Sequence, residues 1–155
     1  MGSAGKARAE GAATGAYLRR LGIDVDLAPV LDTPDSSDNF LGTRAYGGHP
    51  KRNAMLGTAF VKALQAHRVA ATAKHFPGLG TAGANTDTSH VWITTRRADL
   101  DARLALFAAA VCAGVELVMV SNAGYRAYDP SGLPAVLSRR IVSGLLRGSS
   151  ASAAS

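Results

Sequence analysis

The densest run of polar side chains in the sequence is KHFPGLGTAGANTDTSH, from Lys74 to His90. Asp87 and His90 lie three positions apart within this run. A carboxylate that accepts a hydrogen bond from one imidazole nitrogen fixes the tautomer of the ring and raises the basicity of the other nitrogen, which makes the histidine a general acid or base. On spacing alone the simpler interpretation of the pair is a solvent-exposed loop, with an acid/base pair as the alternative.

Two more candidates begin the same run. Lys74 and His75 come at the end of an apolar segment, VAATAK, which predicts a strand over residues 69–74. In parallel α/β folds the ligand contacts lie at the carboxyl ends of the strands. Pro77 and the glycines that follow it predict a tight turn, which would keep the next loop close to a ligand.

The loop after an earlier apolar segment holds the remaining candidates. Asp32 ends the segment APVLDTP, and Arg44 follows in its loop. The guanidinium of Arg44 is a rigid fork that suits a carboxylate or the hydroxyl and carbonyl oxygens of a sugar. Asp32 taken alone is equally compatible with capping a turn. The sequence contains no GxxxxGK[ST] phosphate-binding loop.

The chain has 155 residues, a net charge of +6 and an isoelectric point near 10.0. Its basic residues are spread along the chain with few aromatic residues beside them, so we expect no nucleic-acid partner. A basic interaction domain is the minor alternative, and salt-dependent nucleic-acid binding would be its signature. The single cysteine excludes an internal disulfide and a Cys-rich zinc site. No apolar run reaches the ~18–20 residues that span a bilayer.

Hydrophobic periodicity predicts helices that alternate with strands. The predicted helices cover residues 6–20, 50–67, 100–114 and 139–147, the last with Ser138 as its N-cap, and the predicted strands cover residues 23–31, 69–74 and 115–120. A helix followed by three βα units predicts an α/β fold with a parallel sheet and right-handed crossovers. Three parallel strands leave two bare edges, so we expect part of a larger domain and a marginally stable, aggregation-prone chain.

Three motifs occur in the order DLAPVLDTP, LGTRAYGGHP and KHFPGLG, and VMVSNAGYRAYDP and LSRRIVSGLLRG follow them. On these motifs the chain resembles the N-terminal domain of glycoside hydrolase family 3, in particular its bacterial β-N-acetylhexosaminidase branch. The resemblance implies a partial (β/α)8 barrel of the TIM type. Residues 1–148 would form about three of its βα units, and residues 149–155 would form a flexible tail.

The resemblance also implies an activity and roles for individual residues. The family's enzymes are retaining exo-hydrolases, which here would remove terminal β-linked N-acetylglucosamine without a cofactor or metal. His90 would be the acid/base and Asp87 its orienting partner, in a motif that reads Asp-Thr-Ser-His where the family has Asp-Ser-His. Four residues would bind the terminal sugar: Asp32, Arg44, Lys74 and His75.

The family's aspartate nucleophile lies in a Ser-Asp-Asp motif, and this sequence has no Ser-Asp-Asp. A retaining glycosidase needs a nucleophile and an acid/base, ~5 Å apart in the usual two-carboxylate case. We therefore expect a fragment with negligible hydrolase activity alone, which needs missing barrel segments or a partner chain. The alternatives are a glycan-binding remnant without catalysis and one half of a split barrel.

Overall fold

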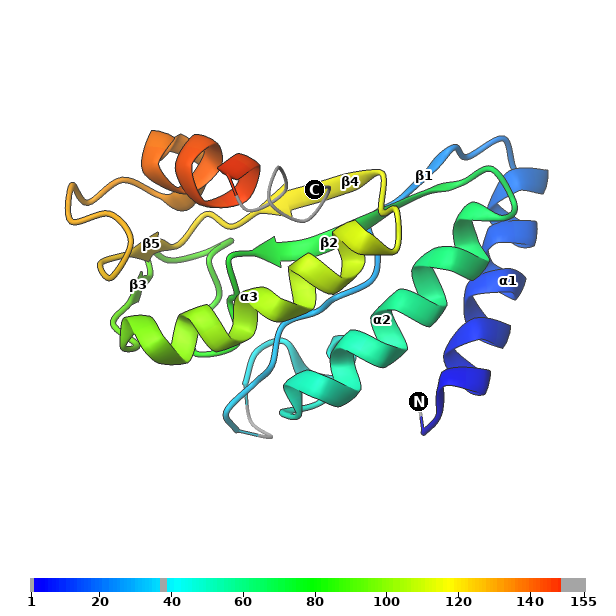
Figure 1. The fold of residues 1–155 in the computed structure, drawn as a ribbon, viewed down its shortest axis with the longest axis horizontal. Helices are drawn as coiled ribbons and strands as arrows, with labels where there is room; N and C mark the ends of the chain where they lie inside the picture. Colours follow the sequence, from blue (N-terminus) through cyan, green and yellow to red (C-terminus); the bar gives the residue numbers. More distant parts are fainter. Residues whose placement is uncertain (1, 37–38, 149–155) are drawn as a thin grey trace.

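Three parallel strands form the sheet that carries the candidate residues (Figure 1). The structure is a computed structural model, and it describes residues 2–36 and 39–148. The sheet has the order β1-β2-β4, with β1 (Val25–Asp26), β2 (Ala70–Phe76) and β4 (Leu117–Val120). Both pairings are parallel, which confirms the predicted α/β class and its parallel sheet.

A second sheet lies beyond the carboxyl ends of these strands. It pairs β3 (Trp92–Ile93) with β5 (Gly124–Tyr125), again in parallel. The strand β3 falls between the predicted strand over residues 69–74 and the predicted helix over residues 100–114. Strands of two residues carry no readable periodicity, because alternation needs at least four positions to be recognised.

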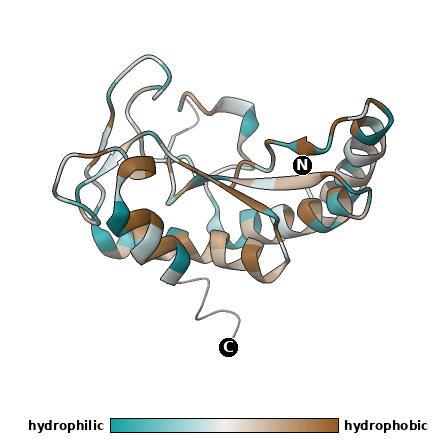
Figure 2. Ribbon diagram, turned by 90° about the horizontal axis from the view of Figure 1, so that it is seen from above, coloured by the Kyte–Doolittle hydropathy of each residue, from teal (hydrophilic) through white to brown (hydrophobic). Residues whose placement is uncertain are grey.

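The long helices α1 (Ala4–Arg20), α2 (Pro50–Gln65) and α3 (Arg97–Cys112) gather along one side of the strands (Figure 2). The shorter helical elements are the 3-10 turns η1 (Gly42–Arg44) and η2 (Ala135–Leu137), and η3 (Arg140–Arg147). Two glycines let α1 approach α2 closely, since a Cβ on Gly11 would lie 2.6 Å from the Phe60 carbonyl oxygen. A Cβ on Gly15 would lie 2.8 Å from the Leu64 carbonyl oxygen.

The main apolar core lies between the sheet and α3. Phe76, at the end of β2, meets Phe107 of α3 edge-on, with ring centroids 5.2 Å apart. Leu100 of α3 and Ile141 of η3 are also buried in this core. The core thus joins β2, α3 and η3, and it supports the carboxyl end of β2.

The first strand is shorter than the predicted span of residues 23–31. Only Val25 and Asp26 have strand geometry, although the chain continues beside β2 as far as the Leu31 N–H, which donates to the Lys74 carbonyl oxygen at 2.8 Å. Pro29 has no N–H and cannot donate to a ladder, so it interrupts the strand.

The last helix, η3, begins at Arg140, one residue later than predicted, with Arg139 at the N-cap position, and it has a different hydrogen-bonding pattern. The Ser138 hydroxyl oxygen still accepts from the Ile141 N–H in the first turn, at 3.2 Å. The turns of η3 are π-helical, with Gly144 near the centre. Glycine weakens the preference for the regular α-helix. The predicted tail, residues 149–155, lies outside the described residues.

Several large apolar side chains on the strands or directly after them face solvent. Val25, Leu27 and Leu117 are each more than two-fifths exposed. This exposure is expected of strands that lack further neighbours. The tendency of the chain to aggregate stays a prediction. In the described part of the chain no helix is both long enough and apolar enough to cross a membrane.

Candidate active site

The carboxylate of Asp32 lies at the centre of the site and is fully buried. Its Oδ1 accepts from the Leu79 N–H at 2.7 Å. Its Oδ2 lies 2.7 Å from Nδ1 of His75 and accepts from the His75 N–H at 3.2 Å. Asp32 therefore connects the chain that follows β1 to the turn that follows β2.

Lys74 lies on β2 next to His75, half-buried at the carboxyl end of the strand. Burial lowers the pKa of its ammonium, and the nearby positive charge of Arg44 lowers it further. The charges of Asp26 and Asp32 oppose this shift. Among the described residues no carboxylate forms an ion pair with the Lys74 ammonium, so its charge is available to a ligand.

Arg44, in η1, is exposed at the same edge. Its Nη2 donates to the Phe40 carbonyl oxygen at 3.4 Å, and the ion pairs of the described residues include none to its guanidinium. Two neighbouring cations that form no ion pair among the described residues favour a ligand rich in oxygen atoms. The structure thus brings Arg44, Lys74 and His75 together at the edge where the sequence predicted ligand contacts.

The turn after His75 is held by contacts from Tyr125 and Thr33 and by a hydrogen bond of its own. The buried Tyr125 hydroxyl donates to the Gly78 carbonyl oxygen at 3.1 Å, and burial raises the pKa of this hydroxyl, which keeps it a donor. Gly80 packs directly against the carbonyl group of Thr33, where a Cβ would collide. The tight turn predicted from Pro77 and its glycines is confirmed, because the Gly78 N–H donates to the His75 carbonyl oxygen at 2.8 Å.

The segment GLGTAG, residues 78–83, has the spacing GxGxxG of a dinucleotide-binding loop. In that motif the glycines open a helix whose N-terminus holds the pyrophosphate. Here the segment follows β2 but does not open a helix, since α3 begins only at Arg97. The geometry therefore does not support a nucleotide site.

The loop from 85 to 90 is the most exposed part of the site. The Asp87 N–H donates to the Asn85 side chain at 3.0 Å, and the Asp87 carboxylate faces solvent. His90 is also exposed, and the described hydrogen bonds include none between it and Asp87. The predicted partnership of Asp87 and His90 thus stays a prediction.

His90 instead contacts Trp92 of β3. The two rings meet edge to face, with centroids 5.2 Å apart. The guanidinium of Arg126 lies over the indole at 4.8 Å, and Gly124 of β5 leaves room for the ring, since a Cβ there would lie 2.6 Å from it. Nothing in the sequence near His90 pointed to Arg126, because β3 and β5 pair across about thirty residues.

Two buried or half-buried side chains that support the site were also missed. Asn53 of α2 is fully buried and donates to the carbonyl oxygens of Gly47 at 2.6 Å and Asp32 at 3.3 Å. Arg103 of α3 donates to Thr33. A signal for Arg103 existed, since it lies three residues after a buried leucine and four before a buried phenylalanine, on the apolar face of the helix.

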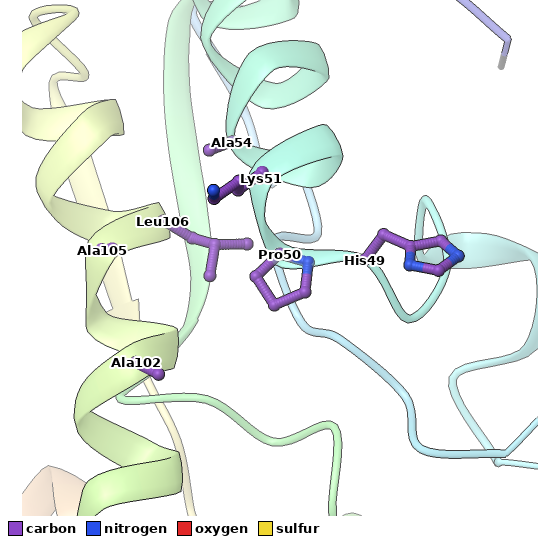
Figure 3. Close-up of a pocket in the computed structure, with 7 residues that line it drawn as sticks. All are labelled: His49, Pro50, Lys51, Ala54, Ala102, Ala105 and Leu106. Carbon is purple, nitrogen blue, oxygen red and sulfur yellow. The ribbon is translucent and has the colours of Figure 1, made fainter.

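A pocket lies apart from these residues (Figure 3). It has a volume of about 570 Å³ and opens between the first turn of α2 and the side of α3. Its lining is mainly apolar: His49, Pro50, Lys51, Ala54, Ala102, Ala105 and Leu106. None of the predicted site residues lines it. No group of acidic, histidine and cysteine side chains in the described ranges could hold a metal ion.

Comparison with known proteins gives the same family from sequence and from structure. Residues 3–151 match the glycosyl hydrolase family 3 N terminal domain. A β-hexosaminidase of Pseudomonas aeruginosa (strain LESB58) is 38% identical over 134 residues, which are 84% of this chain and 39% of the relative. The chain thus spans about two-fifths of the length of this curated relative.

Solved structures agree. A glycoside hydrolase family 3 β-N-acetylglucosaminidase from Paenibacillus sp. superposes with a TM-score of 0.93 at 38% identity, covering 97% of this chain and 29% of that one. NagZ from Neisseria gonorrhoeae, solved in complex with N-trifluoroacetyl-D-glucosamine, superposes with a TM-score of 0.86 at 27% identity, covering 93% of this chain and 42% of that one. The described fold therefore corresponds to one part of a larger barrel domain.

Proposed function

The chain belongs to the family of glycosyl hydrolase family 3 N-terminal domains, and on this basis we propose that it forms part of a β-N-acetylhexosaminidase active site. The reaction would be retaining hydrolysis that releases a terminal β-linked N-acetylglucosamine. This chain would contribute the contacts to that sugar and the acid/base, His90.

The observation that carries the proposal is the convergence of Lys74, His75 and Arg44 at the carboxyl edge of the sheet. Two of these groups are cations without a carboxylate partner among the described residues. A sugar offers several hydroxyl oxygens and an N-acetyl carbonyl oxygen, which these donors suit. The relatives named β-hexosaminidase and the complex of a related enzyme with an N-acylated glucosamine support the same substrate class.

The acid/base role rests on the position of His90 in the loop after β2. An exposed imidazole can exchange protons with a leaving group and with water. The reaction also needs a nucleophile, and the sequence has no Ser-Asp-Asp. We therefore expect sugar binding but negligible turnover from these 155 residues alone, because loss of a nucleophile costs several orders of magnitude in rate.

Binding is tested by titrating the isotope-labelled chain with N-acetylglucosamine and following backbone amide resonances. The expected shifts are at residues 44, 74 and 75, and Lys74→Met should weaken binding by roughly tenfold or more. Lys51→Met is the matched control, since Lys51 is exposed at the separate pocket and should leave binding unchanged. Equal affinity in both variants, or no binding by the wild-type chain, would reject the sugar site.

Turnover is tested with an aryl β-N-acetylglucosaminide. No release of the aryl group is expected from the wild-type chain. Turnover that disappears in His90→Ala would show that a nucleophile is present after all, and would overturn the expectation of an incomplete active site.

A further inference from the structure

We infer that Asp32 is a positioning residue that orients His75 and leaves only the Nε2 atom of its imidazole available to the sugar. The inference rests on the proposed sugar site. It differs from the direct sugar contact that the family resemblance implied for Asp32. Four observations carry it: the burial of Asp32, the donors to its two oxygens, the partial exposure of His75, and the separate support of the Asp32 backbone.

The carboxylate of Asp32 has no exposed surface, whereas 16% of the His75 side chain is exposed. Each oxygen of Asp32 already accepts from within the chain, Oδ1 from Leu79 and Oδ2 from His75. A ligand at the edge of the sheet can therefore reach the imidazole of His75 but not the carboxylate behind it.

The hydrogen-bond pattern also assigns the tautomer of His75. An ionised carboxylate only accepts hydrogen bonds, so the 2.7 Å contact from Nδ1 to Oδ2 requires a hydrogen on Nδ1. In the neutral ring Nε2 then carries a lone pair. His75 is thereby fixed as an acceptor toward a sugar hydroxyl, beside the two cationic donors Lys74 and Arg44.

The same carboxylate fixes where the ring stands. The His75 N–H and the Leu79 N–H both point at Asp32, so residues 75–79 turn around one anion. The backbone of Asp32 is held in turn, since its carbonyl oxygen accepts from the buried Asn53 amide at 3.3 Å. A side chain held this way reaches its ligand with little loss of rotamer freedom.

Asp32→Asn separates this role from simple packing, because the two residues have nearly the same shape. In this variant the carbonyl oxygen of the new side-chain amide can still accept from Leu79, which turns the NH₂ group toward Nδ1 of His75. A donor at that position favours a lone pair on Nδ1 and a hydrogen on Nε2, so the tautomer should switch. Asp24→Asn is the control, since Asp24 is exposed and its carboxylate pairs with Arg19 at the surface.

The measurement is the nitrogen-15 chemical shift of both imidazole nitrogens of His75, at a pH where the ring is neutral. We expect hydrogen on Nδ1 in the wild type and in Asp24→Asn, and on Nε2 in Asp32→Asn. N-acetylglucosamine affinity should fall by roughly tenfold or more in Asp32→Asn and stay unchanged in the control.

The outcomes separate this inference from the proposed function. A wild-type ring with its hydrogen on Nε2 refutes the inference, whatever the chain binds, and this result needs no variant to fold. Wild-type binding that Asp32→Asn leaves intact also refutes it. The expected tautomers without any sugar binding would support the orientation of His75 by Asp32 and reject the sugar site.

Discussion

Arg103 of α3 donates from Nη1 to the Thr33 carbonyl oxygen at 2.6 Å and to the Thr33 hydroxyl at 2.8 Å. Its Nη2 reaches Asp35 at 2.7 Å. One side chain of the helix that packs against the sheet thus fixes the loop that begins directly after the buried Asp32. The support of the site therefore crosses seventy residues of sequence.

Replacing Arg103 by methionine should loosen this loop and destabilise the chain. The Thr33 carbonyl would lose a charge-assisted donor in a half-buried position, which costs about 1–3 kcal/mol of unfolding free energy. Urea unfolding measures the loss. Arg96→Met is the control, because Arg96 is 84% exposed and its surface ion pair with Asp99 is worth less than ~1 kcal/mol. Equal losses in the two variants would contradict the role given to Arg103.

Gly80 should tolerate no side chain. A Cβ there would collide with the carbonyl group of Thr33, which is backbone and cannot rotate away. Gly80→Ala is expected to destabilise the chain by about 1–3 kcal/mol, the usual cost of overpacking. Gly83→Ala, in the same loop but with open space around its Cβ, should change stability by less than ~0.5 kcal/mol. Urea unfolding measures the stability of the two variants. If Gly80→Ala left stability unchanged, the loops that hold Gly80 and Thr33 could move apart without cost.

The strongly periodic elements could be predicted from the sequence. The apolar spacing and Pro50 predicted a helix over residues 50–67, and α2 occupies Pro50–Gln65. The run VAATAK predicted β2, which extends two residues further to Phe76. These predictions succeed because a buried face repeats every 3.6 or 2 residues, and such a repeat is local information.

The sequence indicated which residues could belong to the site, but not which of them are in contact. Asp32, Lys74 and His75 were recognised as candidates, but the burial of Asp32 depends on Leu79 and His75, more than forty residues away in sequence. The same holds for β3 and β5, whose two-residue strands exist only through their mutual pairing. Local periodicity carries no information about pairings between distant segments.

The buried hydroxyl of Tyr125 should contribute to both stability and the shape of the turn after His75. Tyr125→Phe leaves the Gly78 carbonyl oxygen without its donor at 3.1 Å, which costs about 1–3 kcal/mol for a buried acceptor. Thermal unfolding measures the effect. Tyr17→Phe, at an exposed tyrosine of α1, should be neutral within ~0.5 kcal/mol. If Tyr125→Phe were as neutral as Tyr17→Phe, the hydroxyl would have no part in holding the turn.

Asp129 should make the stability of the chain sensitive to acid. The Ser138 hydroxyl donates to its Oδ2 at 2.5 Å and the Ser131 N–H to its Oδ1 at 2.9 Å. These donors, the Ser138 hydroxyl first, lower the pKa of Asp129 from an ordinary 3.8 to about 2. A carboxyl group with a lowered folded-state pKa stabilises the fold fully above the unfolded value, and this contribution disappears as the pH falls through the folded value.

Unfolding free energy should therefore decline between about pH 4 and pH 2, beyond the contribution of other groups. Asp129→Asn removes the titrating group, so it should lower stability at pH 7 and flatten this part of the profile. Ser138→Ala removes the strongest donor and should also flatten it while keeping the carboxyl group. Urea unfolding at a series of pH values measures the unfolding free energy of both variants and of the wild type. A Ser138→Ala profile as steep as that of the wild type would show that the Ser138 hydroxyl is not the main cause of the lowered pKa of Asp129.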